Sequence, residues 1–124
     1  MQDGKNVILA IDDDQDFLDT LRILIEADGY IMEEASTAES GLRMYNKVNP
    51  DAVLVDLMME EIDAGANFVK ELKLLGAQIP VFLLSSAGDG MLDAVDYTSI
   101  GFSGVFQKPP EPKHLLGMLK AKLS

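Results

Sequence analysis

The sequence contains no cysteine and few cationic side chains, and each of these shortages argues against one class of protein. Without cysteine there is neither a disulfide framework nor a thiolate zinc site. Ten Lys and Arg residues stand against 21 Asp and Glu, which gives a net charge of −11. An extended surface for phosphate backbones is not expected from such a balance, so nucleic acid is not an expected direct partner.

Long hydrophobic runs are also absent. The longest, Val7 to Ile11 and Val81 to Leu84, are far too short to cross a bilayer, and the opening MQDGKN lacks the apolar segment of a signal peptide. We therefore expect a cytoplasmic protein that does not engage a membrane. Its 124 residues, 48% hydrophobic and 25% charged, indicate one globular domain over residues 1–124.

Short β-rich runs alternate along the chain with stretches of helical length. The expected strands are Val7–Ile11, Tyr30–Ala35, Ala52–Val55, Val81–Leu84 and Val105–Gln107. The expected helices lie around Phe17 to Ile25, Leu42 to Val48, Gly65 to Leu75 and Met91 to Ser99, and in a last stretch that begins near Pro110 to Lys113. This alternation indicates parallel βαβ units with right-handed crossovers.

Two helix ends carry local signals. Asp28-Gly29 is a reasonable stop for the first helix. The tetrapeptide Ser36 to Glu39 has the Ser-x-x-Glu form of a capping box, which predicts where the second helix begins. Leu42, Tyr45 and Val48 would then form the inward stripe of that helix.

The expected fold is α/β and flavodoxin-like: a doubly wound (βα)5 arrangement with a five-stranded parallel sheet of order 2-1-3-4-5 and helices on both faces. In such sheets ligands bind at the carboxyl ends of the strands, near the point where the strand order reverses. The first and third strands flank that point. Both are followed or ended by aspartate, with Asp12 and Asp13 after the first strand and Asp56 after Val55.

Negative charge is crowded at the end of the first strand. The stretch ILAIDDDQDF, residues 8 to 17, sets Asp12, Asp13, Asp14 and Asp16 against a buried run. Carboxylates this close resist ionising together, and burial adds to the cost, so a cation is expected among them. Asp14 or Asp16 is better explained as the N-cap of the first helix.

The two remaining strand ends add a hydroxyl and an ammonium to the same edge. The fourth strand ends in Ser85-Ser86, and the fifth ends in Lys108-Pro109. Acids, a hydroxyl and a lysine in this order and spacing resemble the receiver domain of two-component response regulators. The resemblance covers nearly the whole chain, about residues 6–123.

The resemblance implies a phosphoacceptor and a metal site. The residue matching Asp56 takes a phosphoryl group from a partner's phosphohistidine and so acts as a carboxylate nucleophile. Mg²⁺ would be held by Asp12, Asp13 and Asp56, with the main-chain carbonyl of Met58 as a further ligand. Carboxylate and carbonyl oxygens are ligands that Mg²⁺ prefers.

A lysine and a hydroxyl complete the implied site, because phosphoryl transfer requires neutralisation of charge on the phosphoryl oxygens. Lys108 would match the invariant lysine of the family. Ser85 would match the switch hydroxyl, with Ser86 as the alternative. Counting from Pro80 favours Ser85, and counting back from Lys108 favours Ser86.

The implied function is signalling rather than conventional catalysis. The domain would catalyse only its own phosphorylation and dephosphorylation, with a histidine kinase or phosphotransfer protein as donor. It would then switch binding to a downstream effector or output domain, and no output domain is expected in this chain. The fourth helix, fifth strand and fifth helix are the expected partner surface, including for a homodimer. Val105 departs from the family at the aromatic switch position, three residues before Lys108.

Three alternatives come from other classes. A haloacid-dehalogenase-type phosphatase also uses an Asp nucleophile with Mg²⁺, but it needs a second Asp where Met58 stands. FMN binding would need a phosphate loop after the first strand, and DDDQD would repel the phosphate. A receiver-like adaptor that binds partners without phosphorylation is the third alternative, although the sequence retains every acid that phosphorylation needs.

Overall fold

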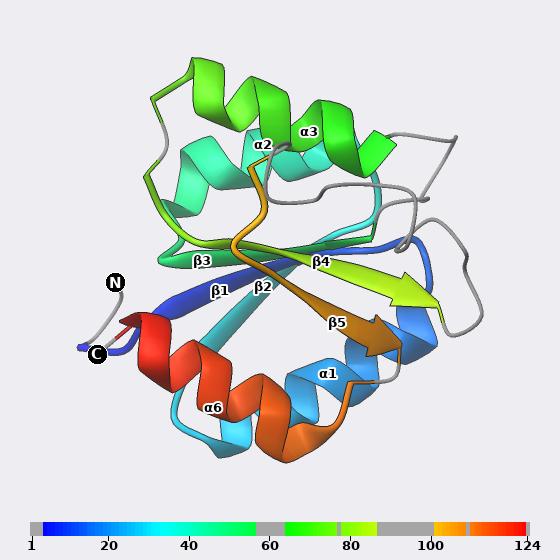
Figure 1. The fold of residues 1–124 in the computed structure, drawn as a ribbon, viewed down its shortest axis with the longest axis vertical. Coiled ribbons are helices and arrows are strands. Elements are labelled where there is room, and N and C mark those ends of the chain that lie inside the picture. The colour runs from blue at the N-terminus through cyan, green and yellow to red at the C-terminus, as the bar shows by residue number, and fades with distance from the viewer. Residues whose placement is uncertain (1–3, 57–63, 77, 87–100, 109, 124) are drawn as a thin grey trace.

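The computed structural model describes residues 4–56, 64–76, 78–86, 101–108 and 110–123 (Figure 1). Five parallel strands lie in the order β2-β1-β3-β4-β5, which confirms the expected topology. The strands are β1 Val7–Ile11, β2 Ile31–Ala35, β3 Ala52–Asp56, β4 Val81–Ser86 and β5 Gly104–Lys108. The helices are α1 Gln15–Ala27, α2 Ala38–Val48, α3 Ala64–Leu74 and α6 Pro112–Leu123. The helix expected at Met91 to Ser99 lies outside the described residues.

Helices cover both faces of the sheet (Figure 1). α1 and α6 lie on one face, and α2 and α3 lie on the other. Alternation along β1 divides the core, because Ile8 and Ala10 pack with residues of α1 while Leu9 and Ile11 pack with residues of α3. All five residues of β1 are buried, as expected for an apolar strand covered on both sides.

The ends of α1 follow the expected signals. Asp14 is the N-cap, and its carboxylate accepts a hydrogen bond from the N–H of Phe17 at 3.2 Å. Asp16 lies in the first turn. Gly29 follows the helix with a φ of 91°, a conformation that suits a residue without a Cβ. The acid-rich segment therefore passes directly into a capped helix.

The capping box expected at Ser36 and Glu39 is wrong by one residue. Thr37 is the N-cap of α2, and its hydroxyl accepts a hydrogen bond from the N–H of Ser40 at 3.0 Å. The Ser40 hydroxyl in turn accepts from the N–H of Thr37 at 3.1 Å. Two capping patterns overlap here, one from Ser36 to Glu39 and one from Thr37 to Ser40. The second is formed, because the Ser40 side chain bonds the backbone of Thr37, whereas Glu39 pairs with Arg43 at 2.9 Å.

The surface of α2 that packs on the sheet includes a glycine. Leu42 and Tyr45 are half-buried against the core, as expected, and Val48 is half-buried as well. Gly41 is buried, and a Cβ at this position would lie 2.6 Å from Cδ1 of Ile11. The missing side chain allows α2 to pack directly on β1.

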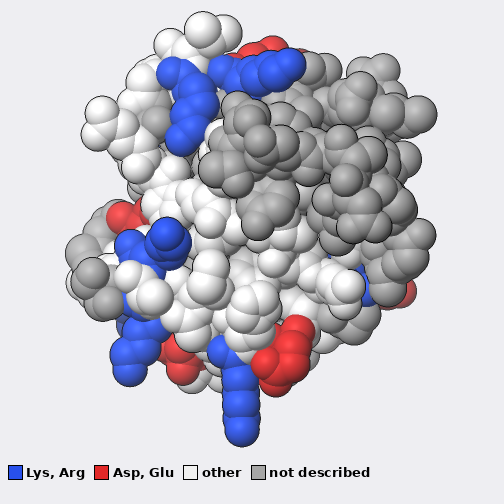
Figure 2. All heavy atoms as spheres, viewed as in Figure 1, with Lys and Arg blue, Asp and Glu red and all other residues white. Residues whose placement is uncertain are grey.

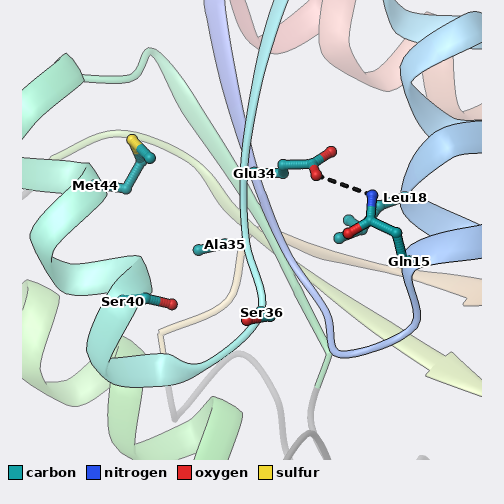
Figure 3. Close-up of a pocket in the computed structure, with 7 residues that line it drawn as sticks. All are labelled: Gln15, Leu18, Glu34, Ala35, Ser36, Ser40 and Met44. Atoms are coloured by element: carbon teal, nitrogen blue, oxygen red, sulfur yellow. Dashed lines mark hydrogen bonds between the residues drawn. The ribbon is translucent and has the colours of Figure 1, made fainter.

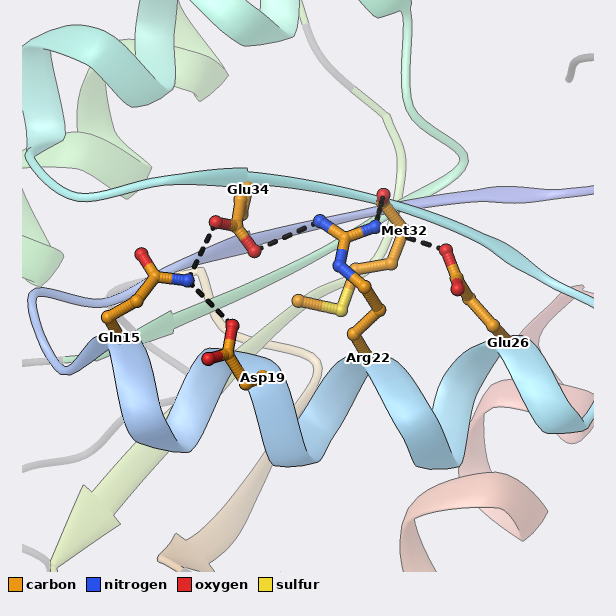
Figure 4. A network of polar contacts seen from close by, with 6 residues as sticks. All are labelled: Gln15, Asp19, Arg22, Glu26, Met32 and Glu34. Carbon is orange, nitrogen blue, oxygen red and sulfur yellow. Dashed lines mark hydrogen bonds and ion pairs between the residues drawn. The ribbon is translucent and has the colours of Figure 1, made fainter.

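Arg22 joins α1 to the edge strand β2 (Figure 4). Its Nη1 donates to the main-chain carbonyl of Met32 at 2.7 Å and to Oε2 of Glu26 at 3.0 Å, and its Nη2 donates to Oε2 of Glu34 at 2.9 Å. Gln15 Nε2 donates to the other Glu34 oxygen at 2.9 Å. The hydrogen bond to Glu34 is the main reason that the pKa of Arg22 lies above its usual range. The start of α1 is thus fixed to β2.

Cationic side chains gather over α3 and α6 in the view of Figure 2. α3 carries Lys70 and Lys73, and α6 carries Lys113, Lys120 and Lys122. These lysines place cationic side chains on two helices that lie on opposite faces of the sheet. Among the described helices none is long and apolar enough to cross a membrane.

Candidate functional site

Three aspartates meet at the carboxyl ends of β1 and β3. Oxygens of the Asp12, Asp13 and Asp56 carboxylates all lie within 4.8 Å of one another. Asp12 is completely buried, Asp56 is half-buried and Asp13 is exposed. The cluster predicted from the strand order is therefore formed, with one acid in the interior and one at the surface.

Backbone hydrogen bonds hold Asp12 in place. Its N–H donates to the carbonyl of Ala35 at the end of β2, at 3.0 Å. Its Oδ1 accepts from the N–H of Asp14 at 3.0 Å. The loop between β1 and α1 thus fixes the buried carboxylate before any ligand binds.

Lys108, the last residue of β5, contacts the cluster through its side-chain ammonium. Nζ lies 2.7 Å from Oδ2 of Asp12 and 3.2 Å from Oδ2 of Asp56. The lysine side chain is only 15% exposed, so solvent weakens these ion pairs less than it would at the surface. When ionised, three carboxylates and one ammonium leave two negative charges for another cation to balance.

Strand alternation explains why these side chains share one side of the sheet. Asp12 continues the β1 series of Ile8 and Ala10, which face α1 and α6. Asp56 stands two residues after Leu54, and Lys108 stands two after Phe106, and both of these apolar residues also belong to the core on that side. The apolar pattern of each strand thus determines where the charged residue after it is directed.

Burial and neighbouring charges compete in this site. Burial raises the pKa of Asp12 above its ordinary value and the charge of Asp56 adds to this, although a hydrogen bond from Lys108 opposes both. Burial alone would lower the pKa of Lys108, but Asp12 and Asp56 outweigh it and the pKa of Lys108 lies above its ordinary value. An ionised Asp12 is costly here, and a bound cation would reduce that cost.

The two candidate serines occupy different positions on β4. Ser85 is 2% exposed, its Oγ has no hydrogen-bond partner among the described residues, and it is in register with Gln107. It follows the series of Val81 and Leu83, which face α2 and α3. Ser86 is the residue in register with Lys108. Burial therefore singles out Ser85, while the strand register singles out Ser86, and the choice stays a prediction. Met58 lies outside the described residues.

The aromatic residue beside Val105 does not replace a switch ring. Val105 is half-buried against the core on the α2 and α3 side. Phe106 is fully buried on the opposite side, where its ring centroid lies 5.3 Å from that of Phe82 and 5.1 Å from that of His114. It therefore belongs to the α6 side of the core.

Phe17 is a site contact that the sequence did not reveal. Its spacing marked it as an apolar residue of α1, yet its ring centroid lies 4.8 Å from Nζ of Lys108. Helical periodicity describes which face a residue occupies, but it does not report contacts with a strand far along the chain.

A separate pocket lies beside the carboxyl end of β2, between α1 and α2 (Figure 3). Its volume is about 270 Å³, and its lining residues are Gln15, Leu18, Glu34, Ala35, Ser36, Ser40 and Met44. None of the three clustered aspartates lines it. Its one carboxylate, that of Glu34, already pairs with Arg22 and Gln15. The acid cluster thus remains the better candidate for chemistry.

Comparison with known proteins identifies the family. The profile described as "Response regulator receiver domain" matches residues 8–120. This chain belongs to that family. It is therefore a receiver domain of two-component signal transduction, a signalling phosphoacceptor rather than a conventional enzyme, and the Asp12, Asp13 and Asp56 cluster is consistent with a phosphoacceptor site. The phosphatase and FMN-binding alternatives are set aside.

Relatives of known sequence are similar over most of this receiver domain. Response regulator protein TodT of Pseudomonas putida is 33% identical over 123 residues, which cover 99% of this chain and 53% of that protein. Response regulator MprA of Mycobacterium leprae is 31% identical over 116 residues, which cover 94% of this chain and 50% of that protein. The chain thus spans about half the length of these relatives.

Solved structures agree on the fold. A putative response regulator from Chloroflexus aurantiacus superimposes with a TM-score of 0.86 at 26% identity, covering 97% of this chain and 98% of that one. A CheY-like receiver domain protein from Methanospirillum hungatei gives a TM-score of 0.85 at 25% identity, covering 97% of this chain and 94% of that one. The flavodoxin-like fold of the receiver domain is confirmed.

Proposed function

We propose that Asp56 accepts a phosphoryl group from the phosphohistidine of a histidine kinase or phosphotransfer protein, and that Asp12 and Asp13 hold Mg²⁺ beside it. One observation carries this proposal. The Asp56 carboxylate ends β3 within 4.8 Å of oxygens from the two other acids, and Lys108 Nζ lies 3.2 Å from its Oδ2. The proposed nucleophile, the proposed metal ligands and a cationic side chain therefore lie at one edge of the sheet.

The residues present fit a divalent ion. They offer carboxylate oxygens, the hard ligands that Mg²⁺ prefers, from one buried and two solvent-accessible side chains. The two negative charges that Lys108 leaves unbalanced match the charge of the ion. Bound Mg²⁺ would neutralise and orient the phosphoryl oxygens during transfer. The main-chain carbonyl of Met58 is proposed as a further ligand from the family resemblance.

The protein groups around the ion have separate tasks in this proposal. One Asp56 oxygen attacks phosphorus, an acyl phosphate forms, and the bond from phosphorus to the donor's imidazole nitrogen breaks, leaving the electron pair on that nitrogen. Lys108 binds a phosphoryl oxygen and neutralises its charge. From the family resemblance, Ser85 is the proposed donor to a second phosphoryl oxygen, with Ser86, which is in register with Lys108, as the alternative.

The phosphorylated domain would act by changing what it binds. We propose that the effector, an output domain or a second copy of the chain contacts β5 and α6, together with residues 91–99, which lie outside the described part. The kinase and the phosphorylated receiver would meet in the cytoplasm, where receiver domains typically occur. A DNA or membrane contact by this domain is not part of the proposal.

Phosphorylation with acetyl phosphate tests the proposal directly. The wild-type protein, incubated with acetyl phosphate and Mg²⁺, should gain one phosphoryl group by intact mass. Asp56→Asn should gain none, and EDTA should suppress the gain in the wild type. Asp16→Asn is the matched control, because Asp16 is an exposed acid in the first turn of α1.

Two results would oppose this function. An adduct that persists in Asp56→Asn would move the acceptor elsewhere. A wild-type protein that gains no phosphoryl group from acetyl phosphate or from histidine phosphodonors would favour the receiver-like adaptor.

A further inference from the structure

The ring of Phe17 is a third neighbour of the Lys108 ammonium, beside the two carboxylates. Phe17 lies in the first turn of α1, where its N–H donates to the Asp14 cap at 3.2 Å. Its side chain is half-buried and packs against the core shared by α1 and α6. The ring centroid is 4.8 Å from Nζ of Lys108. The helix cap thus fixes the residue that carries this ring.

This geometry attracts the cation to the ring. An ammonium within about 6 Å of the centroid of an aromatic ring is drawn to the negative potential of its face. The attraction is strongest where water is excluded, and the Lys108 side chain is 15% exposed. A leucine of similar bulk would keep the apolar packing but would offer no such potential.

The same lysine occupies oxygens that the proposed metal needs. Nζ lies 2.7 Å from Oδ2 of Asp12 and 3.2 Å from Oδ2 of Asp56, and both carboxylates belong to the acid cluster. An ammonium held between them repels an incoming divalent ion and competes for its ligands. Any contact that holds the lysine there also weakens binding of the metal.

We infer that Phe17 is a positioning residue that holds the Lys108 ammonium against Asp12 and Asp56 and thereby lowers the affinity of the acid cluster for Mg²⁺. The effect on Mg²⁺ affinity rests on the proposed function, because it assumes the proposed metal site. The contact between the Phe17 ring and the Lys108 ammonium does not depend on that site, so the affinity and the contact are measured separately.

Titration with Mg²⁺ alone tests the effect on affinity. Phe17→Leu should bind Mg²⁺ about two- to fivefold more tightly than the wild type, because it loses a cation–π contact. Phe17→Tyr retains an aromatic face and should bind as the wild type does. In a Lys108→Ala background, Phe17→Leu should change the affinity little. An unchanged or weaker affinity in Phe17→Leu, or an equal gain with and without Lys108, would overturn the inference.

NMR of the lysine side chain tests the contact without metal. In metal-free wild type and Phe17→Tyr, the Cε protons of Lys108 should show a ring-current shift that Phe17→Leu removes. If wild-type protein binds no Mg²⁺, the metal site of the proposed function fails, while this shift still shows whether Phe17 positions Lys108. An absent shift would rule out the positioning role even if phosphorylation of Asp56 proceeds normally.

Discussion

Nζ of Lys108 lies closer to Oδ2 of Asp12, at 2.7 Å, than to Oδ2 of Asp56, at 3.2 Å. The ammonium therefore contacts the proposed metal ligand more closely than the proposed acceptor. In the proposed reaction it must turn from Asp12 toward an oxygen of the phosphoryl group. Lys108 would therefore have two tasks, to pair with Asp12 before the reaction and to neutralise the phosphoryl group during it. Substitutions can test the two tasks separately.

Lys108→Ala should retain Mg²⁺ binding, at an affinity at least that of the wild type because a competing ammonium is removed, but it should slow phosphorylation of Asp56. The acids remain in place, whereas one fixed positive charge for the phosphoryl oxygens is lost, which costs a rate factor on the order of a hundred. Mg²⁺ titration and the rate of phosphorylation by acetyl phosphate, followed by intact mass, measure the two effects. Loss of metal binding together with phosphorylation would instead make Lys108 a structural requirement of the acid cluster.

Asp13→Asn should weaken Mg²⁺ binding by about tenfold or more, because it removes a ligand charge from the cluster. Asp16→Asn is the matched control and should change the affinity little, since Asp16 lies within α1 rather than among the three clustered acids. Calorimetric titration of both variants gives the comparison. Equal losses would mean that the metal site has been misplaced.

Gly41→Ala should lower the free energy of unfolding by about 1 kcal/mol. A methyl group 2.6 Å from Cδ1 of Ile11 and 3.2 Å from Cε2 of Phe68 overpacks the core, at a cost of roughly 1–3 kcal/mol. That cost exceeds the gain of about 0.5–1 kcal/mol from replacing a helical glycine. Urea denaturation measures the change.

Gly117→Ala in α6 is the matched control for Gly41→Ala. A Cβ at Gly117 would meet no atom within 4 Å, so only the helical preference of alanine should act. The free energy of unfolding should rise by about 0.5–1 kcal/mol. If both alanine variants gain stability, α2 does not pack as closely on β1 as described.

Tyr30 should give the protein an alkaline sensitivity. Burial, with a smaller contribution from Asp28, raises the pKa of Tyr30 in the folded state. The folded state then holds the proton more tightly, so its contribution to stability is complete below the unfolded pKa of about 10 and is lost as pH rises through the folded pKa. Urea denaturation between roughly pH 9 and 11 should show a steeper loss in wild type than in Tyr30→Phe. Parallel losses would remove Tyr30 as the cause.

β1, β3 and β4 were predictable because strands of a parallel sheet that are buried on both faces consist of continuous apolar runs. Val7–Ile11 has the predicted bounds, and β3, β4 and β5 extend the predicted runs by one or two residues. The strand order then brought Asp12, Asp13, Asp56 and Lys108 to one edge, as expected, while their roles stay proposals. Local hydropathy and topology were sufficient for these features.

Contacts that depend on the exact positions of side chains in three dimensions were not predictable in the same way. The cap of α2 falls at Thr37 rather than Ser36, because two capping patterns overlap and the sequence alone does not choose between them. The choice between Ser85 and Ser86 depends on the register of β4 against its neighbours, which spacing along the chain does not determine. The approach of Phe17 to Lys108 joins a helix to a distant strand, and no local pattern reports it.

Arg22 fastens α1 to β2, and the last residue of that strand, Ala35, accepts the hydrogen bond from the N–H of Asp12. The buried acid therefore stands between a helix and a strand that are themselves joined. It has little freedom to follow a ligand, so the ligand and the other side chains must adjust to it. Asp12 is therefore the side chain of the site that stays in place, and we expect Lys108 to move relative to it when Asp56 is phosphorylated.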